Sequence, residues 1–118
     1  MKKEFIEKVY ESIVVGNVQI YTEMIEDKDT DRTVEFWKSA RKIYRELDDS
    51  QHKAFIDFIR QVIIDTISNV FGVLDGICGI DSKEWLCSVT INGESTEDDL
   101  QDTFLEYIEN LINQGVLP

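Results

Sequence analysis

Two pairs of acidic residues have a spacing that could hold a divalent cation. Glu23 and Glu26 lie three positions apart, and Glu46 and Asp49 repeat that spacing further along the chain. Residues three apart share one side of an α-helix. Magnesium prefers several carboxylate oxygens as ligands. Two helices that faced each other with these pairs would therefore form a metal site able to activate water for hydrolysis.

The acidic pairs resemble the motif of the all-α nucleotide pyrophosphohydrolases, which bind magnesium between facing helices. The resemblance implies a divergent magnesium-dependent hydrolase. The chain departs from that motif at Thr22, where the family has a second adjacent acid, and at Asp49, which falls at a helix end. Acid pairs three apart also mark solvated helix faces, and about five are expected by chance in so acidic a chain. We therefore predict a non-enzyme with no catalytic residue, metal site or cofactor, and keep the hydrolase as an alternative.

The other candidates for metal binding or nucleophilic chemistry are His52, Cys78 and Cys87. The spacing of the two cysteines matches no zinc motif, and nothing in the sequence brings either thiol to His52. Glutamates interrupt the residues after Met1, where an export signal would have an apolar run. We therefore expect reduced thiols and a cytoplasmic protein.

The net charge argues against two classes of partner. Asp and Glu outnumber Lys and Arg by 24 to 12, which gives a net charge of -12 and an isoelectric point near 4.3. Nucleic acids and anionic membrane surfaces both attract clustered basic residues, and no segment approaches the ~18 apolar residues of a membrane helix. We expect neither nucleic acid nor membrane as a partner. A nucleic-acid mimic is a second alternative.

The acidic residues are concentrated in the last third of the chain. Residues 84–118 contain no Lys, Arg or His, and they hold eight carboxylates: Glu84, Glu94, Glu97, Asp98, Asp99, Asp102, Glu106 and Glu109. In a helix that begins near Thr96, about one third of the circumference carries four of them: Asp98, Asp102, Glu106 and Glu109. Like charges on one face are mildly unfavourable for an isolated helix. We predict that these four residues bind a basic protein.

Helical periodicity covers most of the chain. Apolar residues recur at three- and four-residue steps in four segments, which cover residues 3–26, 32–47, 51–74 and 96–115. The third segment is apolar around most of its circumference, which predicts a helix at the centre of a bundle. A carboxylate there must be paired, so Asp65 is expected to tie two helices together. The second segment carries a basic stripe, expected to be solvated and to neutralise acids of the last helix or of a neighbouring subunit: Lys38, Arg41, Lys42 and Arg45.

A two-residue alternation over residues 85–91 predicts a strand, with residues 77–80 as its partner. Asn92-Gly93 is expected to leave this sheet, and Ser95 or Thr96 is expected to cap the last helix, with Asp98 or Asp99 reaching back. The predicted fold is a single domain of residues 1–118. It is mainly α (α+β), with antiparallel helices and a small two-stranded hairpin before an acidic C-terminal helix.

The chain also resembles small acidic α-rich bacterial proteins of unknown function. The resembling segments are Asp65-Thr66, Leu74-Asp75-Gly76, Leu100-Gln101-Asp102 and Phe104-Leu105-Glu106-Tyr107. The resemblance implies no assigned activity and no functional residue. Some small, acidic, intracellular proteins are immunity proteins that block a bacterial toxin, which is an analogy of class. We therefore expect a non-catalytic protein-binding module, such as an immunity or inhibitor protein, and leave homodimerisation open.

Overall fold

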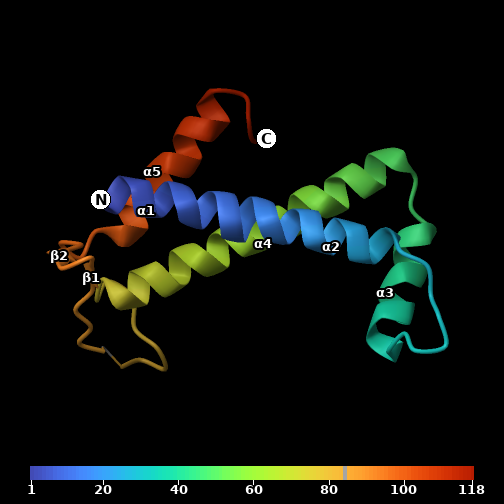
Figure 1. Cartoon of the computed structure of the whole chain (residues 1–118), viewed down its shortest axis with the longest axis horizontal. Coiled ribbons are helices and arrows are strands. Elements are labelled where there is room, and N and C mark those ends of the chain that lie inside the picture. The colour runs from blue at the N-terminus through green and yellow to red at the C-terminus, as the bar shows by residue number, and fades with distance from the viewer. Residues whose placement is uncertain (84) are drawn as a thin grey trace.

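The computed structural model describes residues 1–83 and 85–118. It is mainly helical, and a two-stranded antiparallel sheet precedes the C-terminal helix (Figure 1). The predicted fold class is thereby confirmed, whereas the single domain stays a prediction. Across the described residues, none of the helices has both the length and the hydrophobicity needed to cross a bilayer.

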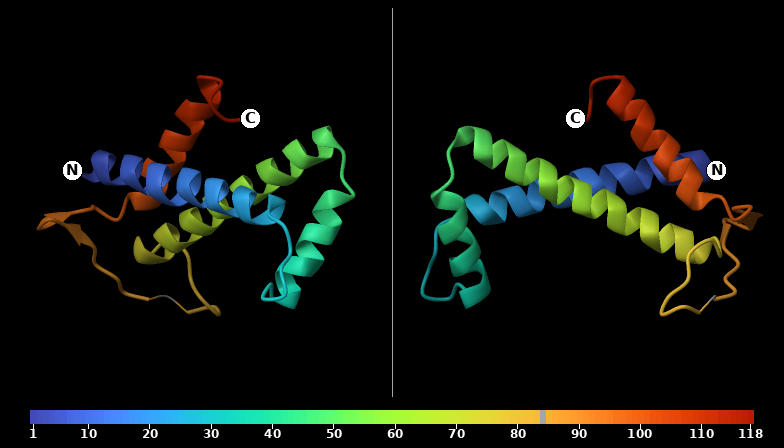
Figure 2. Two further views of the ribbon diagram at one scale, coloured as in Figure 1. Left: turned by 45° about the vertical axis from the view of Figure 1, so that its right-hand side comes forward. Right: turned by 180° about the vertical axis from the view of Figure 1, so that it is seen from behind.

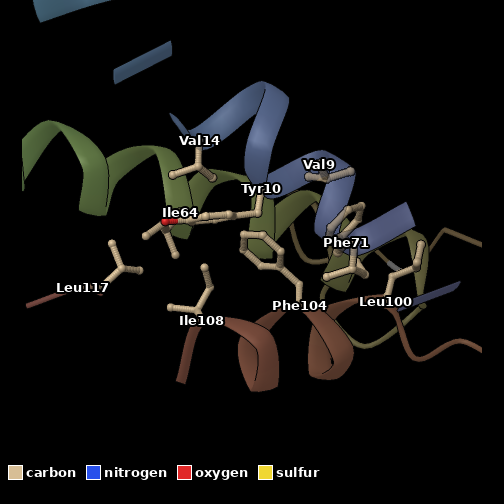
Figure 3. Close-up of a cluster of buried hydrophobic side chains, with 10 residues drawn as sticks. Val9, Tyr10, Val14, Ile64, Phe71, Leu100, Phe104, Ile108 and Leu117 are labelled. Atoms are coloured by element: carbon tan, nitrogen blue, oxygen red, sulfur yellow. The ribbon is translucent and has the colours of Figure 1, made fainter. Parts of the chain in front are cut away.

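The first 26 residues form one continuous helical rod. It consists of α1 (Lys2–Val9), the π-helical segment η1 (Tyr10–Val15) and α2 (Gly16–Glu26). Gly16 keeps right-handed helical angles, with φ -60° and ψ -47°, so it does not break the rod. The wider π-helical turns, which are rare and short in proteins, lie beside the core, into which Tyr10 and Val14 point (Figure 3).

Helix α3 (Glu35–Arg45) is shorter than predicted, and its buried side includes Arg41 beside Tyr44. Its N-cap residue is Val34, whose side chain has no acceptor for a capping bond, and Thr30 and Thr33 bond to each other within the preceding loop. Arg41, predicted to be solvated, is only 6% exposed. Its guanidinium donates to the Met24 carbonyl oxygen at 2.7 Å and to the Asp29 carboxylate at 3.1 Å.

Helix α4 (Asp49–Leu74) begins and ends as its sequence predicts. The Asp48 carboxylate accepts from the Gln51 backbone N–H, and the Gln51 side chain accepts from the Asp48 N–H, which makes a reciprocal capping box. Beyond the other end, Gly76 adopts φ 76°, a left-handed conformation that glycine takes without strain.

The buried side of α4 includes two residues without large apolar side chains. Ser68 and Gly72 are buried, because α5 (Leu100–Asn113) packs there. The Gln101 amide donates to the Ser68 carbonyl oxygen at 3.0 Å, and a Cβ atom at Gly72 would lie 2.7 Å from the same amide nitrogen. Among the described residues, Asp65 is exposed and accepts a hydrogen bond from Gln61 on its own helix alone, so its predicted role between helices is wrong.

The core forms where three helical segments meet. Figure 3 shows α1 and η1 on one side, α4 behind them and α5 below, with apolar side chains converging between them. Its buried members are Ile6, Val9, Tyr10, Val14, Ile64, Phe71, Leu100, Phe104, Ile108 and Leu117. Helix α3 lies away from this cluster at the far end of the molecule (Figure 1) and packs against α2.

The hairpin lies later in the chain than predicted. Strands β1 (Thr90–Ile91) and β2 (Glu94–Ser95) pair antiparallel, and Asn92-Gly93 forms the turn between them with φ values of 50° and 83°. Positive φ at both central residues suits a tight hairpin turn. The predicted pairing of residues 77–80 with 85–91 is wrong, because a tight turn between Ile80 and Lys83 forms a single bridge instead of a ladder.

The whole chain is open in shape. Its radius of gyration is 17.4 Å, whereas a compact domain of 118 residues has about 13.5 Å. The rod and α4 cross near their middles, and their ends diverge in all three ribbon views (Figures 1 and 2). A core that occupies only one end of this cross leaves much of both helices uncovered.

Candidate functional site

The acidic region divides into a turn and a helix. Thr96 is buried, and its N–H and hydroxyl both donate to the Val89 carbonyl oxygen. This tie keeps Thr96 with the hairpin, so α5 begins at Leu100 rather than near Thr96. Glu97 and Asp98 follow in left-handed conformations, with φ 58° and 52°. The prediction that Asp98 lies on the helical face is therefore wrong, because Asp98 sits in the turn ahead of the helix.

A buried carboxylate from α4, rather than a local side chain, caps α5. The Asp75 carboxylate accepts from the Leu100 N–H at 3.0 Å and from the Gln101 N–H at 2.8 Å. The predicted caps from Ser95 or Thr96 are wrong, since Asp99 is the N-cap residue and its side chain makes no capping hydrogen bond. Asp75 complements the positive end of the helix dipole. The role of Asp75 is therefore structural. Because it lies 25 residues before Leu100, no local sequence pattern indicates this cap.

Three of the predicted binding residues lie together on α5. Asp102, Glu106 and Glu109 are exposed, while Leu100, Phe104 and Ile108 on the same helix are buried. Across residues 1–83 and 85–118, the ion pairs involve none of these three acids and not Asp98. Their charges are therefore available to a partner, although the binding role itself stays a prediction.

Helix α1 extends this negative surface. Glu7 and Glu106 line the same hollow of about 260 Å³ between α1 and α5, together with Lys3 and Tyr107. The pKa of the Tyr107 phenol is raised above its usual 10.0, first by burial and then by the charges of Glu7 and nearby Glu11. We call Asp102, Glu106, Glu109 and Glu7 the acidic surface.

The basic stripe of α3 does not face the acidic surface. Arg41 and Arg45 both bind Asp29, at 3.1 and 3.6 Å, so they hold the loop before their own helix. The prediction that this stripe neutralises acids of the last helix is wrong. Near the start of α5, the ammonium group of Lys2 lies 3.2 Å from the Asp99 carboxylate.

A second polar site lies where α2, α3 and α4 meet. Glu26, Tyr44 and His52 line a hollow of about 630 Å³ there. The Tyr44 hydroxyl donates to Glu26 at 3.0 Å, its ring stacks on His52 at 4.0 Å, and His52 Nε2 lies 2.7 Å from the Tyr44 carbonyl oxygen. Burial, followed by Glu26, raises the pKa of the phenol above 10.0. The contacts of Tyr44 with Glu26 and His52 join α2, α3 and α4.

The raised pKa of Tyr44 predicts a loss of stability in alkali. The folded chain holds the phenolic proton more tightly than the unfolded chain, so this stabilisation is complete below pH 10.0 and is lost as the pH rises through the raised pKa. We expect Tyr44→Phe to reduce the loss of unfolding free energy between about pH 8 and pH 11 in urea titrations. Phe55→Leu changes a neighbouring ring that does not titrate, and it should shift stability equally at both values. If Tyr44→Phe and the wild type lose the same unfolding free energy in alkali, this expectation is contradicted.

The four carboxylates of the hydrolase interpretation are not gathered into a site. Within the described part of the chain, no three His, Cys, Asp or Glu side chains form a group that could hold a metal ion. Glu26 bonds to Tyr44, and Asp49 starts α4. Within the described residues, the two acidic pairs therefore do not come together as one metal site.

An apolar groove between the rod and α4 was not predicted from the sequence. It encloses about 560 Å³, and uncharged residues line it: Ile13, Asn17, Tyr21, Phe58, Ile59, Val62, Ile63, Thr66 and Ile67. The α4 residues among them were predicted to be core because their helical spacing indicates a buried face. Spacing does not reveal whether the same chain or another molecule covers that face.

Comparisons of the chain with models of protein families, with curated proteins and with solved structures found no match. The two resemblances noted from sequence motifs therefore receive no support from these comparisons. A function must be argued from the surfaces themselves.

Proposed function

We propose that this chain is a non-catalytic protein-binding module that acts in the cytoplasm and uses its acidic surface to bind a basic protein. The observation that carries the proposal is the row of Asp102, Glu106 and Glu109, which are exposed on a well-packed helix. The described residues offer no Lys or Arg partner to any of them. An immunity or inhibitor protein is the concrete form of the proposal.

Electrostatics explains what such a surface would achieve. Complementary charges accelerate encounter and disfavour wrong partners more than they add to affinity. The net charge of -12 attracts a basic protein from a distance, and the acidic surface orients it. The same charge repels nucleic acid and anionic membranes. The two free cysteines agree with a reducing compartment, which supports the cytoplasmic part of the proposal.

A double charge reversal tests the role of the surface. Asp102→Lys with Glu106→Lys should slow association with the partner by about tenfold or more, since steering depends on local charge. Both side chains are exposed, so the circular dichroism spectrum and melting curve should stay close to wild type. The partner is found by affinity capture from a lysate, identified by mass spectrometry and then purified for rate measurements over a salt series. Binding through exposed charges should weaken as salt rises.

The matched control changes the net charge by the same amount elsewhere. Glu23→Lys with Glu35→Lys reverses two exposed acids on α2 and α3, and α3 lies at the far end of the molecule from α5 (Figure 1). This control should keep most of the association rate. If both double variants slow association equally, the total charge rather than the acidic surface steers the partner. If neither does, the charge serves solubility and the proposal fails.

A neighbouring toxin gene tests the immunity form of the proposal. Co-expression of the wild-type chain with that toxin should restore growth. The Asp102→Lys/Glu106→Lys variant should protect less well at equal protein levels, and the Glu23→Lys/Glu35→Lys variant should protect as well as wild type. A toxin that kills equally with and without the chain would exclude this form.

A further inference from the structure

The groove between the rod and α4 leaves large apolar side chains uncovered. Phe58 is 68% exposed and Val62 is 49% exposed, although both lie in the middle of the structure. On α4 the groove residues form two adjacent ridges, one through Phe58, Val62 and Thr66 and the other through Ile59, Ile63 and Ile67. Ridges with four-residue spacing are the surfaces by which helices pack into one another's grooves.

The total surface of the chain is larger than that of a compact monomer. The accessible area is 8354 Å², whereas a folded chain of 13.7 kDa exposes about 6,600 Å². The excess of about 1,800 Å² per chain falls in the range that an obligate homodimer buries on each subunit, about 1,000–2,500 Å². The missing contacts of this open shape therefore have the size of a dimer interface.

Charge indicates which face a second copy could approach. Two chains of -12 each repel one another wherever their acids meet. The groove lining contains no charged residue, so two copies can meet there without burying carboxylates. A basic partner, in contrast, gains nothing from an uncharged lining, which separates this groove from the acidic surface.

We propose that the groove binds a second copy of this chain, and that the two rods and two α4 helices form a four-helix core. The interface would be isologous, with each copy offering the same surface. Phe58 both lines the groove and projects from α4, so α4 of one copy can fill the groove of the other while its own groove is filled in return. Figure 2 shows α4 lying across the rod, with the two diverging on either side of the crossing. This proposal concerns a different surface from the one proposed for the basic partner, and either can fail alone.

Sedimentation equilibrium of the wild-type chain is the first test. We expect a mass of about 27 kDa, twice the 13.7 kDa of one chain, over the micromolar range. The melting temperature should also rise with protein concentration, as it does when folding and association are coupled. A wild-type chain that stays at the mass of one copy overturns the proposal, and the groove would then belong to another polypeptide or an apolar ligand.

Substitutions locate the interface. Val62→Lys places a charge in the groove and should give a folded monomer, whereas Leu105→Lys changes an exposed apolar residue on α5 and should stay dimeric. If Val62→Lys does not fold, the milder Val62→Ala is the test. The dissociation constant of the Val62→Ala dimer should be at least tenfold higher than that of the wild-type dimer, whereas that of the Leu105→Ala dimer should not change. A dimer that is indifferent to both Val62 variants overturns the proposal, because its interface must then lie elsewhere.

Discussion

Phe104→Ala should lower the free energy of unfolding by about 3–5 kcal/mol, the range for deleting a buried aromatic ring. The Phe104 side chain is fully buried, at 0% exposed, and its ring meets Phe71 edge-on at 5.7 Å between centroids. It belongs to α5 and lies where α4 and the N-terminal rod converge (Figure 3). Removing it leaves a cavity among three helical segments that cannot all close around it.

The matched control is the same change at an exposed phenylalanine. Phe36 on α3 is 71% exposed, and Phe36→Ala should change stability by less than about 1 kcal/mol. Urea titrations of both variants give the comparison. Both are made at one protein concentration, so that any self-association contributes equally to the two results. Equal losses would mean that the apolar cluster around Phe104 is not the core of the fold.

The sequence predicts the helices well because their signals are local. Apolar residues at helical spacing mark each segment, and Asp48 and Gly76 mark the ends of α4 by capping chemistry that involves only nearby residues. The hairpin was misplaced because the alternation over residues 85–91 outweighed the Asn92-Gly93 turn signal. That turn needs only two short strands, and the structure supplies two residues on each side.

The sequence does not predict which side of each helix is covered. Arg41 was assigned to solvent by its type, yet Asp29 and the Met24 carbonyl oxygen compensate its burial. Phe58 was assigned to the apolar face of α4, yet nothing in the described residues covers most of it. Both errors have one cause, because burial depends on neighbours that are distant in sequence or that belong to another molecule.

The acidic surface was predicted only in part, again because contacts between residues distant in sequence decide which acids belong to it. Asp102, Glu106 and Glu109 keep their helical spacing, so the sequence places them correctly relative to one another. Asp98 was misplaced because Thr96 bonds back to Val89 and delays the start of the helix. Glu7 was missed because it joins this surface only when α1 packs beside α5.

Asp75→Ala should also be strongly destabilising, with an expected cost of about 3–6 kcal/mol for the loss of two hydrogen bonds to a charged group. Its carboxylate accepts two backbone N–H groups at the start of α5, and a hydrogen bond to a charged group contributes about 1.5–3 kcal/mol. Alanine would leave both N–H groups, one of them on buried Leu100, without an acceptor. Asp75→Asn keeps one acceptor oxygen, so about half of that loss is expected from it.

Asp65→Ala, on the helix that ends just before Asp75, provides the matched control. Asp65 is exposed and bonds only to Gln61, so its removal should change the free energy of unfolding by less than about 0.5 kcal/mol. Hydrogen exchange adds a local measurement, because the amides of Leu100 and Gln101 should lose protection in Asp75→Ala before the rest of α5. If the two alanine variants unfold at the same denaturant concentration, apolar contacts alone hold α5 in place. The acidic surface would then depend on Phe104 and its neighbours rather than on the link between the ends of α4 and α5.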